Sequence, residues 1–188
     1  DLLVANLHNV ATYLTNKNLP IWYDSFLRKI KYEDLDTGEV GNWEDKQTLK
    51  LTKHLQQYEG LRRIGRDIVD QGVSLYAFSK ERNELREYLD SLEWDGQRRL
   101  DTWLSDYCGA VSSPFVREAG RCWLLGAVAR AYQPGTKFDH MLVLEGEQGL
   151  GKSTVFEILA GSWFDELGKF DGKDSAEKLA GVWIVENH

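Results

Sequence analysis

The chain has 188 residues, of which 42% are hydrophobic and 12% are aromatic. This composition is enough for a packed core and excludes a chain that is disordered throughout. The formal net charge of -7 argues against a surface that coats nucleic acid broadly, because such a surface needs a basic face. Local basic patches remain compatible with this charge.

The sequence also does not indicate a membrane protein, a disulfide-rich protein or a metal-binding protein. No run of residues approaches the length of about 18 apolar residues that a membrane span needs, and the first residues lack the basic start of a signal peptide. The two cysteines, Cys108 and Cys122, and the four histidines fit no disulfide framework and no metal-ligand spacing. We therefore expect a soluble cytoplasmic protein without a zinc site.

Helical periodicity dominates the first two thirds of the chain. Apolar residues recur at helix spacing, and glycines or prolines end the segments. Ser113 is the expected N-cap of the longest of these helices, with Pro114 at its first position. The predicted helices cover residues 1–19, 44–58, 64–78, 85–92, 100–107 and 114–132.

One segment between the first two helices departs from this pattern. Residues 21–43 are rich in aromatic and β-branched side chains and contain the turn sequence Asp36-Thr37-Gly38, which predicts a β-hairpin. We interpret its aromatic residues as core rather than as a platform for stacking bases; they are Trp22, Tyr23, Phe26 and Tyr32. A basic cluster further along is interpreted as a solvated face rather than a DNA-backbone contact; it comprises Arg62, Arg63 and Arg66.

The spacing of apolar residues changes from a helical pattern to one that mixes strands and helices after Pro134-Gly135. The sequence predicts a buried strand at 140–145, a helix at 152–160, a short helix capped by Asp174 and a second buried strand at 182–185. We therefore expect two domains, a mostly helical one at residues 1–133 and a second one at residues 134–188. The predicted fold class is α/β, with a mostly α-helical N-terminal domain followed by the start of an AAA+-like P-loop core with a parallel sheet.

The loop between the predicted strand and helix reads Gly-x-x-x-x-Gly-Lys-Ser, the P-loop pattern. Glycines let the backbone wrap around a phosphate, and the helix N-terminus adds partial positive charge. Lys152 is expected to reach the β- and γ-phosphates of ATP, and Ser153 to place its hydroxyl on Mg²⁺. The predicted nucleotide-binding residues are Gly146, Glu147, Gln148, Gly149, Leu150, Gly151, Lys152, Ser153 and Thr154.

The second predicted strand ends in Glu186, followed by Asn187. A carboxylate at the tip of an apolar strand commonly handles Mg²⁺ or orients the attacking water in P-loop NTPases. We therefore predict Lys152 and Glu186 as catalytic residues, and Ser153 and Glu186 as metal ligands. The alternative for Glu186 is an ordinary acid that faces solvent at the end of a strand. Asn187 is a weaker candidate for orienting water.

Several motifs in order resemble one protein family. They lie at residues 94–100 (WDGQRRL), 120–124 (GRCWL), 127–130 (AVAR) and 134–139 (PGTKFD), and they lead into the P-loop. Together they are similar to the virulence-associated E family, P-loop proteins of phages and mobile genetic islands related to superfamily 3 replicative helicases. Residues 146–153 match its Walker A motif and residues 182–186 its Walker B strand.

This resemblance implies an ATP- and Mg²⁺-dependent DNA helicase or replication-initiation ATPase in a bacterial host. It implies a homo-oligomeric ring with ATP at subunit interfaces, and single-stranded or forked DNA and replication proteins as partners of the full-length protein. The family pattern continues beyond Glu186 with a further acid, a sensor strand and an arginine finger. We therefore expect this chain to be the front part of a longer protein and to bind ATP while hydrolysing it poorly.

Two other function classes stay open. A small-molecule kinase needs a lid rich in arginine after the P-loop helix, and residues 161–181 contain no arginine, which disfavours it. A non-catalytic module that docks a replication partner and uses nucleotide only as a switch fits the large helical part.

Overall fold

The computed structural model describes residues 4–167, 179 and 181–187. The chain divides into two compact units, Asp1–Glu84 and Leu85–His188. It is a mixed α/β protein, and each of its two sheets contains a parallel pair of strands. The domain boundary predicted near residue 133 lies inside the second unit, because helix α6 (Pro114–Tyr132) packs on residues that follow it. The Nε1 of Trp183, for example, donates a hydrogen bond to the Ala127 carbonyl at 2.9 Å.

The first unit contains a four-stranded sheet in the order β3-β2-β1-β4. Its strands are β1 (Ile21–Asp24), β2 (Lys29–Glu33), β3 (Val40–Asn42) and β4 (Glu81–Arg82). The pairs β1–β2 and β2–β3 are antiparallel, whereas β4 runs parallel to β1. The predicted hairpin is thus confirmed as the β2–β3 pair, and an additional turn separates β1 from β2.

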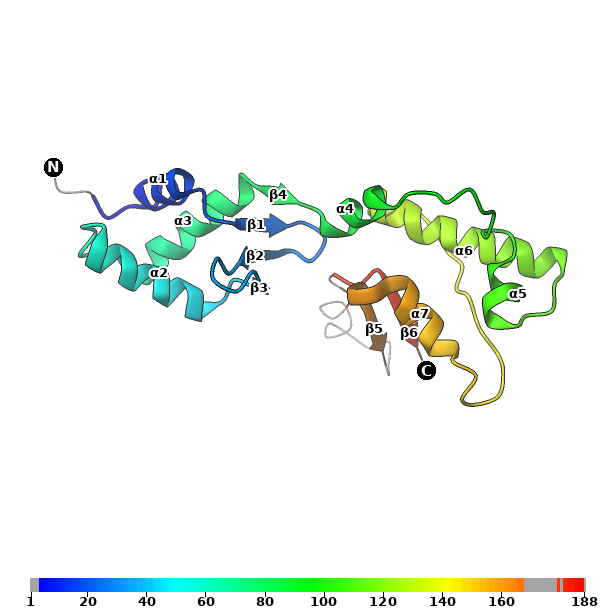
Figure 1. The fold of residues 1–188 in the computed structure, drawn as a ribbon. Coiled ribbons are helices and arrows are strands. Elements are labelled where there is room, and N and C mark those ends of the chain that lie inside the picture. Colours follow the sequence, from blue (N-terminus) through cyan, green and yellow to red (C-terminus); the bar gives the residue numbers. More distant parts are fainter. Residues whose placement is uncertain (1–3, 168–178, 180, 188) are drawn as a thin grey trace. The chain divides into compact units, whose positions relative to one another are not determined.

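Three helices complete the first unit: α1 (Leu7–Lys17), α2 (Asp45–Tyr58) and α3 (Arg66–Phe78). In Figure 1, α3 runs between α1 and α2 and also packs against β1. Asn6 caps α1 by accepting from the Asn9 N–H, and Asn18 ends it in the left-handed conformation. Trp22 is buried, and Tyr23 and Tyr32 pack against the core, as the sequence predicted.

The second unit carries the remaining helices, and each begins and ends close to its predicted limits. They are α4 (Glu84–Ser91), α5 (Trp103–Cys108), α6 and α7 (Lys152–Ala160), with a 3-10 turn η1 (Gly161–Trp163) after α7. Ser113 caps α6 as predicted, because its Oγ accepts from the Val116 N–H at 3.2 Å. Within the described residues, no helix is both long and apolar enough to cross a membrane.

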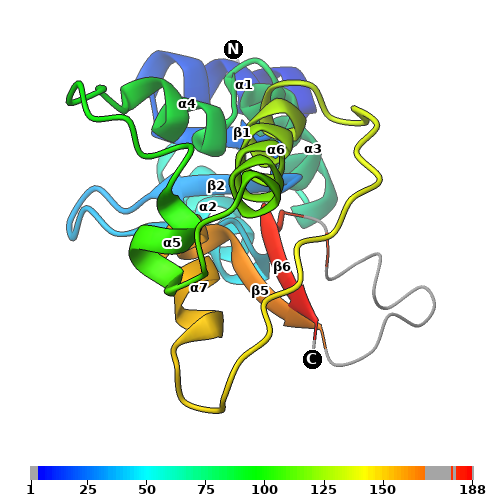
Figure 2. The ribbon, with the colours of Figure 1, turned by 90° about the vertical axis from the view of Figure 1, so that its right-hand side faces the viewer.

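Two parallel strands lie beside α7, namely β5 (Phe164–Leu167) and β6 (Ile184–Asn187) (Figure 2). The prediction of a strand at 182–185 is confirmed with a shift of two residues, whereas β5 was not predicted. The short helix predicted from Asp174 lies outside the described residues.

The strand predicted at 140–145 is wrong, since these residues adopt no regular secondary structure. Figure 2 shows this segment as an irregular coil between α6 and α7. Leu142 and Leu144 pack partly against the core of the second unit, whereas Met141 and Val143 are exposed. The alternation of a strand is therefore present, but a strand also needs a partner for its backbone hydrogen bonds. Among the described residues, none forms a ladder with this segment.

Candidate functional site

The predicted phosphate loop lies in the second unit, between the irregular segment and α7. Gly149 and Gly151 adopt positive φ angles of 87° and 75°, in the left-handed region that a side chain disfavours. The glycines at these two positions therefore permit a backbone path that most other residues would resist. Gly146 has no positive φ, so the backbone conformation at this position does not itself require a glycine.

The first turn of α7 begins directly after this loop. Its N-cap is Gly151, which has no side chain to occupy the N–H groups of the first turn. Neither acidic nor aromatic residues occupy that turn, which consists of Lys152, Ser153 and Thr154. These free N–H groups, with the positive end of the helix dipole, form a general anion-binding arrangement.

Lys152 folds back over the loop. Its Nζ donates to the carbonyl oxygens of Gly146 at 3.0 Å and Glu147 at 2.8 Å. These two partners of the ammonium group are neutral carbonyl oxygens, with which an anion would have to compete. Glu147, Gln148 and Leu150 are exposed at the rim of this loop.

Ser153 and Glu186 meet although they come from different elements. The Ser153 Oγ donates a hydrogen bond to the Glu186 Oε1 at 2.9 Å, so the start of α7 and the end of β6 converge on one point. Both side chains are half-buried. Asn187, by contrast, is exposed at the last position of β6, where it lies opposite Leu167 in the β5–β6 ladder.

This pair also defines what kind of cation the site can hold. Among the described residues, no group of three or more histidine, cysteine, aspartate or glutamate side chains is arranged to hold a metal ion. Mg²⁺ does not need such a cage, because it is usually bound through one or two protein oxygens, with phosphate oxygens and water completing the shell. The hydroxyl of Ser153 and the carboxylate of Glu186 are hard oxygen ligands that suit Mg²⁺.

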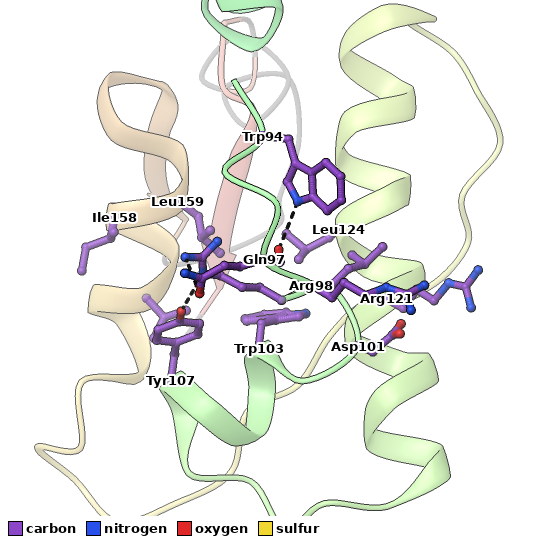
Figure 3. Close-up of a pocket in the computed structure, with 13 residues that line it drawn as sticks. Trp94, Gln97, Arg98, Asp101, Trp103, Tyr107, Arg121, Leu124, Ile158 and Leu159 are labelled. Carbon is purple, nitrogen blue, oxygen red and sulfur yellow. Dashed lines mark hydrogen bonds between the residues drawn. The ribbon is translucent and has the colours of Figure 1, made fainter. Parts of the chain in front are cut away.

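The segment 94–100 forms the wall of a separate cavity of about 920 Å³ (Figure 3). The cavity opens between this segment, α5, α6 and the outer side of α7. Its lining includes Trp103 and Tyr107 from α5, Leu124 from α6, and Ile158 from α7. Trp103 is buried, whereas the Tyr107 side chain is 62% exposed.

A polar network fixes the shape of this wall. The Arg99 guanidinium donates to both carboxylate oxygens of Asp95, at 2.9 and 2.7 Å, and its Nε donates to the Tyr107 hydroxyl at 3.2 Å. The hydrogen bond from Arg99 is the main cause that lowers the pKa of Asp95 to about 2. At the other end, the Trp94 Nε1 donates to the Gln97 carbonyl. Most of these hydrogen bonds join residues within segment 94–100, so they stabilise the turn that this segment forms.

Comparison with protein families gives one match in this part of the chain. The virulence-associated protein E-like domain matches residues 89–188, which is more than half of the chain and lies within the second unit. Comparison with curated proteins gives no match. The matched range includes segment 94–100, the phosphate loop and the Ser153–Glu186 pair.

Proposed function

The chain belongs to the virulence-associated protein E-like family, and on that premise we propose that it binds ATP with Mg²⁺ at the phosphate loop. The proposed activity is that of a DNA-dependent ATPase of helicase type. Family membership supports a role associated with the replication of a phage or a mobile genetic element. DNA, replication proteins and further copies of the same chain are the proposed partners.

The observation that carries this proposal is the 2.9 Å hydrogen bond between Ser153 and Glu186. An ordinary acid at the end of a strand would face solvent and have no reason to meet the second residue of a helix. A hydroxyl that follows the loop lysine and a carboxylate at a strand tip are the two protein groups that hold Mg²⁺ in P-loop NTPases. Their contact in this chain supports the predicted roles of both residues.

Each residue has a defined task in this proposal. The N–H groups of the loop and of the first turn of α7 would donate hydrogen bonds to the phosphate oxygens, and Lys152 would exchange its two carbonyl contacts for contacts to the β- and γ-phosphates. Ser153 and Glu186 would hold Mg²⁺, which would neutralise charge on these phosphates. Glu186 would also be the group that orients a water molecule toward the γ-phosphate.

The first unit favours a second candidate function. It is a compact body with its own sheet and core, and it lies outside the matched family range. An interaction module would use this unit to dock a replication partner and use nucleotide binding only as a switch. Steady ATP turnover that rises with single-stranded DNA would favour the ATPase, whereas tight ATP binding without turnover would favour the module.

The decisive experiment is a calorimetric titration with Mg·ATP of the wild type, of Lys152→Ala and of Lys137→Ala. Lys137 is a suitable control because it is exposed and pairs with Asp139 at 3.1 Å, away from the loop. We expect binding by the wild type and the control. Loss of two charge-assisted contacts of about 1.5–3 kcal/mol each should weaken binding by Lys152→Ala by about a hundredfold or more. Equal affinity of all three proteins would refute the assignment.

A further inference from the structure

A recess of about 350 Å³ opens beside the phosphate loop, on the side of α5 and α6. Its lining starts at the loop itself, with Leu150, Gly151 and Lys152, and continues along Val155 of α7. The opposite walls come from the end of α5 and the first two turns of α6. Those walls include Leu104, Cys108, Val116 and Ala119. Lys152 therefore belongs both to the lining of the recess and to the phosphate loop.

We propose that this recess takes the adenine ring of the bound nucleotide, an inference that rests on the proposed function. A ligand with its phosphates at Lys152 has its base directed away from the loop, and the recess is the hollow that adjoins the loop there. Its volume lies at the lower end of the range for small-molecule sites, about 300–1,000 Å³. It is thus suited to one flat ring system and not to a large substrate.

The chemistry of the walls favours adenine over other bases. Most lining side chains are aliphatic, and the half-buried ones include Val116, Ala119 and Val155. The lining also contains one acidic side chain, the exposed Glu145. The N–H groups of Gly109 and Ala110 at the end of α5 both donate to the Leu104 carbonyl, so they offer no donor to a base. A base whose polar edge carries an unmatched carbonyl would lose hydrogen bonds to water on entering.

Adenine carries no carbonyl group, whereas guanine and cytosine each carry one. Adenine also buries more ring area than cytosine against the aliphatic walls. The recess therefore sets the order of affinity, with ATP ahead of both GTP and CTP. Inorganic tripolyphosphate, which has no base, reports the contribution of the phosphate loop alone.

The test fills the recess while leaving the loop intact. Ala119→Trp places an indole in the recess from the first half of α6, and Ala129→Trp places the same side chain on the exposed surface of the same helix. Both variants and the wild type are titrated with Mg²⁺ complexes of ATP, GTP, CTP and tripolyphosphate. Circular dichroism melting curves check that each variant is folded.

We expect the wild type to bind ATP at least about fivefold more tightly than GTP or CTP, and about tenfold more tightly than tripolyphosphate. In Ala119→Trp, the affinity for ATP should fall to the affinity for tripolyphosphate, and the affinity for tripolyphosphate should not change. Ala129→Trp should bind all four ligands as the wild type does. If ATP binds no better than tripolyphosphate, or if Ala119→Trp keeps full ATP affinity, the recess is not the base site although the phosphate loop works. If neither ATP nor tripolyphosphate binds the wild type, both proposals fail.

A second measurement does not depend on the folding of Ala119→Trp. Cys108 lines the recess, and burial raises the pKa of its thiol, so alkylation by iodoacetamide is followed at alkaline pH in a Cys122→Ser background. We expect saturating Mg·ATP to slow the modification of Cys108 several-fold and tripolyphosphate to leave it unchanged. Equal modification rates with both ligands bound would overturn the assignment.

Discussion

Replacing Gly126 by alanine tests how α6 is held against the segment that leads to the phosphate loop. Gly126 is a buried residue in the middle of α6. A Cβ atom added there would lie 2.4 Å from Cε2 and 2.6 Å from Cδ2 of Phe138. No real contact is this short, so the aromatic ring would have to move.

Two opposing terms determine the size of the effect. Alanine in a helix interior is more stable than glycine by about 1 kcal/mol. Displacing a ring from a packed position costs about 1–3 kcal/mol, and the half-buried Phe138 lies at the lower to middle part of this range. We therefore expect Gly126→Ala to lower the free energy of unfolding of the second unit by up to about 1 kcal/mol. In a Phe138→Ala background the clash is absent, and the same substitution should stabilise by about 0.5–1 kcal/mol.

The assay is native-state hydrogen exchange of the α6 amides, because it reports on this unit and not on the first one. The wild type, both single variants and the double variant form a double-mutant cycle. A stabilising effect of Gly126→Ala in the wild-type background, or an equal effect in both backgrounds, would refute the close packing of Phe138 on Gly126.

The remaining predictions concern the metal pair and the polar network of segment 94–100. Ser153→Ala should weaken ATP binding about tenfold in Mg²⁺ and leave it unchanged in EDTA. The control Glu157→Gln, at an exposed position of the same helix, should have little effect on calorimetric titrations under either condition. For Asp95, the hydrogen bond from Arg99 lowers the pKa to about 2, below the value of about 3.9 in an unfolded chain. The stabilisation from this pair is therefore complete above pH 4 and is lost as the pH falls through 2. Melting curves between pH 5 and pH 2 should show this loss of stability in the wild type and in the exposed control Asp101→Asn, but not in Asp95→Asn. Identical pH profiles for Asp95→Asn and the wild type would contradict the prediction.

Local signals in the sequence were sufficient to predict most of the helix limits and the glycine-rich loop before α7. Helix limits follow from local signals, and the cap at Ser113, the proline at position 114 and the glycine after Cys108 all lie at the ends the structure shows. The glycines of the loop were recognisable for the same reason, since Gly149 and Gly151 serve a local backbone conformation. The roles predicted for the loop in nucleotide binding remain predictions.

Features that depend on contacts between residues far apart in the chain could not be predicted from these local signals. The alternating segment 140–145 reads as a strand, but whether it becomes one depends on a partner for its N–H and C=O groups, and the sequence pattern does not specify that partner. Strand β5 was missed because Phe164–Leu167 is too short to show a pattern of its own and is held by pairing with β6. The contact between Ser153 and Glu186 likewise exists because α7 and β6 pack together. The adjoining recess was invisible in the sequence for a related reason, since its aliphatic walls on α5, α6 and α7 become one surface only when these helices meet.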